Sequence, residues 1–296
     1  MSDASPSLNL ESVRAIAKKD VHDAARSKVL WLLSVLFVAF LGGAAFVFVQ
    51  FEQAVAAEGA EVAATDLVLF LEGPVAWLLP LIGLLVGYKA VAGEVDSGTG
   101  KILFTLPHSR LDVVVGKLVG RTLVLWATFL VGLVVSLAVI VALYDELAVT
   151  AILTFAVLSM LLGAVFVSIG VTISALTTST TKAAAAIVGV FVFLYFVFDS
   201  FRLVGYYLLT GSVMPAPGSN PSAWYLLYPR LNPIEAYSAA LNGLVSDLVH
   251  PEVFQYFEDP AAVPFYLSGW FALVLLLVWL VVPPALGYLR FRRLDL

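Results

Sequence analysis

Long uninterrupted apolar stretches are the feature of this sequence that most restricts its fold. Several exceed 18 residues, the length that a helix needs to cross the hydrocarbon core of a bilayer. Hydrophobic residues make up 61% of the chain and charged residues only 12%, whereas soluble domains average about 45–50% apolar and about 25% charged. The pattern predicts an all-α, polytopic membrane protein.

Six membrane-spanning helices are expected, and residues 1–296 are expected to form a single transmembrane domain in the lipid bilayer. The stretches run from about 29 to 49, 67 to 92, 122 to 143, 149 to 175, 183 to 208 and 264 to 289. The first contains Gly42 and Gly43 and the second Gly83 and Gly87, small residues of the kind that let helices approach closely. An even number of spans places both ends of the chain on one side of the membrane.

The cationic residues indicate which side that is. Of the 16 Lys and Arg residues, all but Arg202 and Arg230 lie before the first span, beside the loop after the second, in the turn after the fourth, or at the C-terminus. Membrane-protein loops rich in Lys and Arg face the cytoplasm. We therefore expect a multi-pass protein of the cell (plasma) membrane, with both termini and the loop at 94–117 in the cytoplasm.

Two further helices are expected outside the spans. Residues 9–28 carry apolar side chains at three- to five-residue spacing with basic residues between them. This pattern is typical of an amphipathic helix in the membrane interface, with a solvated N-terminal helix as the alternative. The external segment 210–263 is rich in proline and in the aromatic residues that favour the headgroup layer. Its part after Pro233 is expected to form a short helix that lies on, or dips into, the outer leaflet.

The loop at 94–117 contains more than a connection needs. Gly98 and Gly100 precede an apolar run that Leu106 and Pro107 close, and Ser109 then stands where a helix N-cap is expected. The interpretation is a short amphipathic cytoplasmic helix, a break at Pro107 and a second helix that enters the membrane. Because an apolar run in the cytoplasm needs a cover, we expect a partner to bind it.

The residues do not form a recognisable catalytic or metal-binding motif. The stretch 97–101 is not a phosphate-binding P-loop, because Val95 stands where the first glycine is needed and Ile102 where a magnesium-holding Ser or Thr is needed. There are no cysteines and the three histidines are isolated, which disfavours zinc chemistry. A net charge of −5 without a basic face makes nucleic acid an unexpected partner. We expect no enzyme activity and no cofactor bound directly.

One pair of opposite charges falls inside a span. Asp199 and Arg202 are three residues apart in the fifth stretch, so they share a helix face and can neutralise each other. At 1.5 Å per residue they lie about 24 Å from the inner end. That depth is near the outer interface, where a charge costs less than at the midplane. For this intramembrane pair both a structural and a functional role stay open.

The loop resembles the signature of ABC-2 type transporter permeases. The residues that carry the match are Glu94, Gly98, Thr99, Leu103, Leu106, Pro107, Ser109, Arg110, Gly116 and Lys117. Within that family the chain is similar to NosY-type permeases, which are associated with the maturation of nitrous oxide reductase, and the similarity covers essentially the whole chain. Lys101 and Phe104 depart from the usual Leu-rich run.

The resemblance implies a permease subunit without catalysis of its own. The residues of the match, Gly116 aside, would form a coupling element that docks on a separate ABC ATPase subunit, and that subunit would bind ATP and Mg. Two copies of the chain, a homodimeric permease, would assemble with two ATPases and export or extrude a substrate. The main alternative is an ion-coupled secondary transporter that acts without an ATPase.

Overall fold

The structure, a computed structural model, describes residues 8–26, 28–58, 63, 65–96, 109–143, 147–219, 221–245, 256–257 and 263–291, and these residues include no β-strand. The elements are α1 (Leu10–Ala25), α2 (Lys28–Ala57), α3 (Asp66–Gly87), α4 (Ala92–Asp96), α6 (Arg110–Leu143), α7 (Val149–Ala175), α8 (Thr180–Val192), the π-helix η1 (Phe193–Val197), α9 (Phe198–Thr210), α10 (Ala223–Arg230), α11 (Pro233–Val245), the 3₁₀ turn η3 (Phe265–Leu267) and α13 (Gly269–Phe291).

All six expected spans are confirmed as helices long and apolar enough to cross a membrane: α2, α3 together with α4, α6, α7, the continuous run α8–η1–α9, and α13. Three boundaries differ from the expectation. The first helix continues to Ala57, past the expected end at about 49. The third helix begins at Arg110, well before the expected start at about 122, and its first turns carry charged residues such as Asp112 and Lys117. The sixth begins at Gly269 because η3 occupies the residues just after Pro264.

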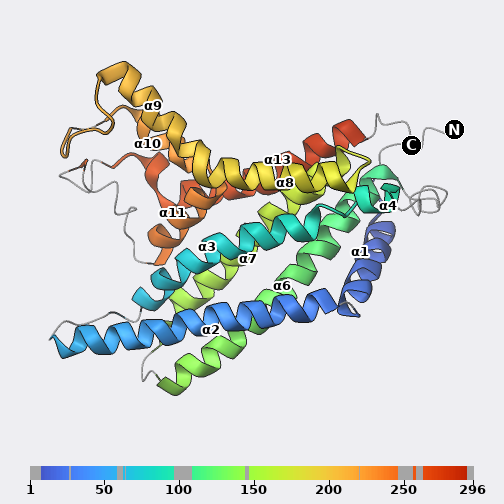
Figure 1. The fold of residues 1–296 in the computed structure, drawn as a ribbon, viewed down its shortest axis with the longest axis horizontal. Coiled ribbons are helices and arrows are strands. Elements are labelled where there is room, and N and C mark those ends of the chain that lie inside the picture. The colour runs from blue at the N-terminus through green and yellow to red at the C-terminus, as the bar shows by residue number, and fades with distance from the viewer. Residues whose placement is uncertain are drawn as a thin grey trace.

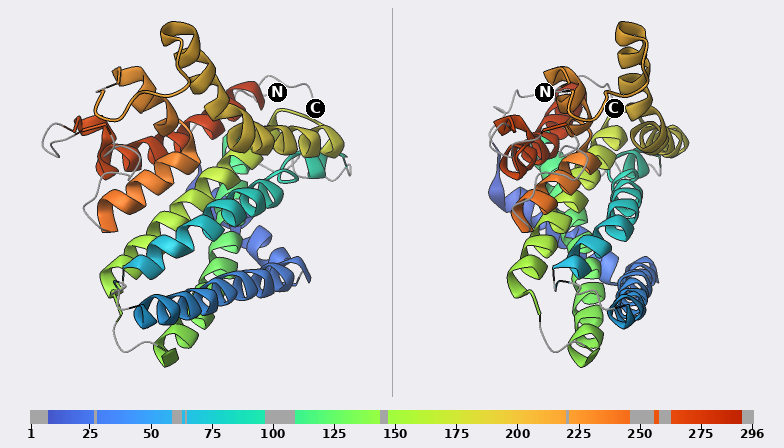
Figure 2. Two further views of the ribbon diagram at one scale, coloured as in Figure 1. Left: turned by 60° about the vertical axis from the view of Figure 1, so that its left-hand side comes forward. Right: turned by 90° about the vertical axis from the view of Figure 1, so that its left-hand side faces the viewer.

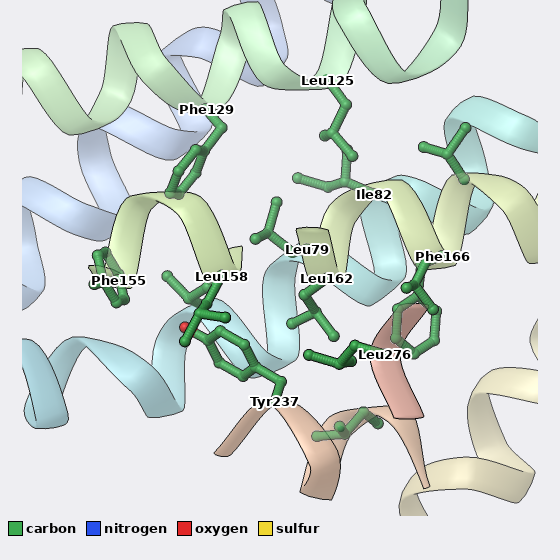
Figure 3. Packing of buried hydrophobic residues seen from close by; sticks show 14 of the residues in the cluster. Leu79, Ile82, Leu125, Phe129, Phe155, Leu158, Leu162, Phe166, Tyr237 and Leu276 are labelled. Atoms are coloured by element: carbon green, nitrogen blue, oxygen red, sulfur yellow. The ribbon is translucent and has the colours of Figure 1, made fainter. Parts of the chain in front are cut away.

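Helix α7 forms the centre of the bundle. It packs against α3, α6, α11 and α13, and its most apolar stretch is 61% buried within the chain. Figure 3 shows Leu158, Leu162 and Phe166 of α7 between residues of α3, α6 and α11. The sequence of α7 is apolar on every side, which is typical of a helix surrounded by protein.

Glycines set the closest of these contacts. A Cβ at Gly83 would lie 2.8 Å from Phe166 Cβ, and one at Gly87 would lie 2.8 Å from Val167 O. The expected packing role of these two α3 glycines is therefore confirmed, with α7 as the partner. For α2 the expectation holds only at Gly42, where a Cβ would lie 3.6 Å from Ser136 Oγ of α6, since one at Gly43 would meet nothing within 4 Å.

Prolines inside the spans free carbonyl groups that neighbouring helices then satisfy. Pro80 has no N–H to donate to Ala76 O, and that oxygen accepts a hydrogen bond from the Tyr195 hydroxyl of η1 instead. Pro283 similarly leaves Trp279 O free, and the Ser168 hydroxyl donates to it at 3.3 Å. Such replacements are what allow helix-breaking residues within a bilayer.

The fifth span is interrupted, which the sequence did not predict. The π-helix η1 separates α8 from α9, and the chain changes direction between them (Figure 1). Its freed carbonyl at Leu194 accepts a hydrogen bond of 2.8 Å from Asn232 Nδ2. Asn232 Oδ1 also accepts from Ile234 N at 3.0 Å, and Pro233 occupies the first position of α11. One residue thus starts α11 and holds the bend in the fifth span.

A helix does begin at Pro233, as expected, and it packs inside the bundle. Figure 2 shows α11 beside α7 and α13, which are its main contacts. The buried Tyr237 hydroxyl lies 2.9 Å from Ser159 Oγ of α7, and burial raises the pKa of Tyr237. Further along α11, Asn242 Nδ2 donates to Glu72 Oε2 of α3 at 3.0 Å. Tyr237 and Asn242 of this helix are therefore buried against protein, whereas Glu235 is exposed.

Candidate functional site

A buried ionic network joins three segments at one end of the bundle, where α1, α4 and the start of α6 meet (Figure 1). Lys117 Nζ of α6 lies 2.9 Å from Asp20 Oδ1 of α1, and it also donates a hydrogen bond to Glu94 Oε1 of α4. The Lys117 side chain is 4% exposed and that of Asp20 is 5% exposed. Arg121 Nε lies 2.9 Å from Asp20 Oδ2 and completes the network. We call these four residues the inner ionic network.

The N-terminus of α6 is held by a second polar group. Ser109 Oγ accepts a hydrogen bond from Asp112 N at 3.1 Å, and Asp112 Oδ2 accepts one from Ser109 N at 2.9 Å. This reciprocal arrangement is a capping box, so the expected cap at Ser109 is confirmed. Asp112 Oδ1 also accepts from Asn9 N at 2.8 Å, which attaches the start of α1 to the start of α6.

Close approach of α1 to α6 makes the network geometrically feasible. A Cβ at Gly116 would lie 2.8 Å from Ile16 Cβ, and a Cβ at Gly120 would lie 2.7 Å from Asp20 Cβ. Glycines four residues apart therefore give α6 a smooth strip on which α1 lies. The structure explains the Gly116–Lys117 pair in the sequence: the glycine lets α1 approach closely, and the lysine reaches Asp20 of α1 and Glu94 of α4.

Helix α4 is anchored on its other side as well. The Ser174 hydroxyl of α7 accepts hydrogen bonds of 2.9 Å from both Val91 N and Ala92 N, which are free N–H groups at the start of α4. At its other end Asp96 Oδ2 accepts from Thr180 Oγ1 at 2.5 Å, at the start of α8. The five residues of α4 are therefore linked to α1, α6, α7 and α8 together.

The structure brings together part of the residue set chosen from the sequence. Glu94 and Lys117 bond directly, while Ser109 and Arg110 begin α6 close to them in the chain. The other candidates, Gly98, Thr99, Leu103, Leu106 and Pro107, lie outside the described residues, as does the expected helix before Pro107. The described part of the site is thus the two ends of the loop, residues 94–96 and 109–117, which we call its stems.

Sequence reasoning missed the partners of these stems. Asp20 was detectable, because it lies on the same face of α1 as the buried Val13, Ile16 and Ala17, at i+7 from the first of them. An acidic residue on a buried stripe signals a cation opposite it. Ser174 gave no such signal, since serine in an apolar helix usually bonds to its own backbone.

The charged pair in the fifth span is formed but not buried. Arg202 Nε lies 2.7 Å from Asp199 Oδ1, and Arg202 Nη2 lies 2.9 Å from Oδ2. The Asp199 side chain is 51% exposed on this chain. Arg202 also stacks over the Tyr225 ring at 4.6 Å. Burial raises the pKa of Tyr225 to about 12, so its hydroxyl stays protonated and the ring stays neutral beside the cation.

The inner end of the bundle is held together by ionic contacts between helices. Within the ranges that the structure describes, no three His, Asp or Glu residues are grouped so that they could hold a metal ion. The acidic groups of the network are occupied by Lys117 and Arg121. Such an arrangement can transmit a displacement of the loop to several helices.

Comparisons with known proteins agree with this architecture. The sequence model of the family described as "ABC-2 family transporter protein" matches residues 14–296. A protein of Pseudomonas aeruginosa named "Probable ABC transporter permease protein NosY" is 31% identical over 229 residues, which are 76% of this chain and 79% of that protein. A protein of the same name from Stutzerimonas stutzeri is 29% identical over 295 residues, covering 96% of this chain and 99% of the relative.

Proposed function

The chain belongs to the ABC-2 family and is the transmembrane permease subunit of an ABC transporter, and from this premise we propose that its 94–117 segment docks a separate ATPase subunit. That subunit would bind ATP and Mg, and the complex would export or extrude a substrate across the plasma membrane. Both termini and the docking segment would lie in the cytoplasm, as the distribution of basic residues favours.

The observation that carries the proposal is the attachment of α4. Glu94 connects it to Lys117 and through that residue to α1, while Ser174 and Thr180 connect it to α7 and α8. A force applied to the loop therefore acts on the inner ends of five helices at once. The rigid, buried part of this linkage is what a coupling element needs to bias the bundle between two packings.

The mechanism follows from that linkage. ATP binding would close two ATPase subunits on each other and draw the two docked loops together. The movement would enter each permease chain through the stems of the loop, at Glu94 on one side and Arg110 on the other. Because α1 is bound to α6 through Asp20 and Asp112, the N-terminal helix would move with α6 as one body.

A second copy of the chain is the proposed cover for the fifth span. Only 11% of the most apolar stretch of α8–η1–α9 is buried within the chain, against 61% for α7, and α9 has no buried residue. The half-exposed Asp199 lies on this surface. Charge in contact with lipid is costly, whereas a homodimeric permease would enclose it between two polypeptides.

The docking proposal is tested by affinity purification in mild detergent, followed by mass spectrometry and an ATPase assay. We expect a stoichiometric P-loop ATPase with the natural chain and less of it with Arg110→Glu. Glu94→Gln should keep the ATPase bound but alter its ATP hydrolysis, because the amide retains shape and loses charge. Glu52→Gln, on α2 away from the loop, is the control. Recovery of the chain alone would favour an ion-coupled secondary transporter.

The dimer proposal can be tested by cysteine cross-linking, since the natural chain has no cysteine. Val204 of α9 is 56% exposed and Val47 of α2 is 55% exposed on the single chain, so they form a matched pair of exposed positions. We expect Val204→Cys to yield disulfide-linked dimers in membranes and Val47→Cys to yield none. Equal cross-linking at both positions would contradict the proposed interface.

A further inference from the structure

A cavity of about 620 Å³ lies between α6 and α13, with Ala164 of α7 contributing to its lining. Its walls come from the first half of α6 and the last half of α13, including Leu118, Pro284 and Ala285. The polar groups on these walls are few: the hydroxyls of Thr122 and Tyr288, and the indole N–H of Trp126, which is already donated to Met160 O at 2.7 Å. We call this cavity the α6–α13 groove.

The groove opens onto the outer surface of the bundle. Several of its lining residues are well exposed, among them Leu123 at 44%, Val281 at 62% and Leu289 at 45%. Both walls are membrane-spanning helices, so the medium outside them is hydrocarbon rather than water. The volume falls within the range of about 300–1,000 Å³ that is usual for ligand sites. An acyl chain is the ligand that matches this shape, polarity and location.

Basic residues lie at the end of the groove near the inner ionic network. Arg110 comes one residue before Leu111, which lines the groove, and Arg290 follows Leu289, which also lines it. Arg290 is exposed and forms no ion pair within the described part of the chain. Two further arginines follow in the sequence. An anionic headgroup is therefore favoured at this end over a zwitterionic one.

From these observations we infer that the α6–α13 groove is a specific site for an anionic phospholipid of the inner leaflet. One acyl chain occupies the apolar walls, and the phosphate lies near Arg290. The occupied segment of α6 is also the segment whose other side carries Gly116 and Lys117. Bound lipid would fill the space behind the surface on which α1 packs.

The test titrates the purified chain with phosphatidylglycerol or phosphatidylcholine of the same acyl chains, with native mass spectrometry as the readout. We expect phosphatidylglycerol to bind more tightly, and Arg290→Gln to weaken it by about fivefold, the effect of about one basic residue near a charged headgroup. Ala285→Trp, an exposed wall position, should reduce the binding of both lipids. The controls are Ala142→Trp, at the other end of α6, and Lys182→Gln, an exposed cation of α8; both should bind as the natural chain does.

A second measurement needs no groove-filling variant. Brominated phosphatidylglycerol quenches nearby tryptophan, and Trp126 lines the groove. We expect a saturable quenching component at low mole fraction in phosphatidylcholine nanodiscs, absent in Trp126→Phe. Equal binding of the two lipids, equal losses in Ala285→Trp and Ala142→Trp, or quenching that persists in Trp126→Phe would each overturn the site. A change of oligomeric state in Ala285→Trp, with lipid binding intact, would instead assign the groove to another protein chain.

Discussion

Two ion pairs in this molecule use the same chemistry in opposite surroundings. In the inner ionic network, Lys117 and Asp20 are buried and join elements 97 residues apart in the chain. In the fifth span, Asp199 and Arg202 lie three residues apart on one helix, and Asp199 is half exposed. The first pair connects two helices far apart in the chain, whereas the ion pair of the second lies within one turn of α9, and Arg202 also stacks on Tyr225 of the neighbouring α10.

This difference shows at which of the two places an ion pair contributes to the fold. A buried carboxylate that loses its cation must be left unpaired in a low-dielectric site, so removing either partner is expensive. A pair on one helix turn can open to its surroundings at little cost. The inner pair therefore fixes a fold, while the function of the outer pair depends on what covers it. The following predictions test this contrast.

Breaking the inner ionic network should have the largest effect. Lys117→Met leaves Asp20 and Glu94 buried without their shared cation, and we expect the free energy of unfolding to fall by about 3–5 kcal/mol. Denaturant unfolding in detergent micelles measures it. The variant that also carries Asp20→Asn and Glu94→Gln should recover much of the loss, because neither buried carboxylate is then left charged and Arg121, which loses Asp20, is partly exposed. A triple variant less stable than Lys117→Met would contradict this explanation.

The close approach beneath the network is the next target. Gly120→Ala places a methyl group where the nearest atom, Asp20 Cβ, is only 2.7 Å away. We expect a cost of about 1–3 kcal/mol from overpacking, together with weaker attachment of α1.

The matched control is Gly43→Ala, also within a spanning helix, where the added Cβ meets nothing within 4 Å. It should be neutral or stabilise by up to about 1 kcal/mol through helix propensity. Protection of α1 from limited proteolysis would fall in the first variant and stay unchanged in the second. If the two variants behave alike, the packing of α1 on α6 does not depend on this glycine.

Substitutions at Asn232 test whether hydrogen bonds stabilise the bend at η1 and the start of α11. Asn232→Ala removes the donor to Leu194 O and the N-cap of α11, so we expect a loss of about 1–3 kcal/mol. Asn232→Asp can still cap α11 but faces the Leu194 carbonyl with an acceptor. It should therefore be at least as destabilised, as measured by thermal unfolding. Full stability of Asn232→Asp would show that the π-helix carbonyl needs no donor.

Much of the fold was predictable, because membrane spans are determined by long local runs of apolar residues. The six spans were derived from such runs. The Ser109 cap and the α3 glycines were derived from equally local patterns, a capping residue and a spacing of four. The bend at η1 was not, since it depends on Asn232, 38 residues from the carbonyl that it satisfies.

The candidate site was predictable in position and incomplete in membership. The stems at Glu94 and Lys117 stand out in the sequence, but Asp20 and Ser174 are 97 and 82 residues from the groups that they bind. Such pairings follow from how helices pack, which a single sequence does not specify. The exposure of Asp199 was not predictable either, because it depends on which neighbours the fifth span has.

The outer pair should show the smallest effect on the stability of the isolated chain. In detergent, Asp199→Asn combined with Arg202→Gln should change the free energy of unfolding by less than about 1 kcal/mol, the range for exposed pairs. The two amides keep similar shapes, so packing on Tyr225 is little disturbed. A loss comparable to that of Lys117→Met would mean that the two pairs do not differ as their burial indicates. The same variant in membranes tests the proposed dimer: if a second copy covers α9, cross-linking through Val204→Cys should fall although stability does not, because the pair would then act between chains.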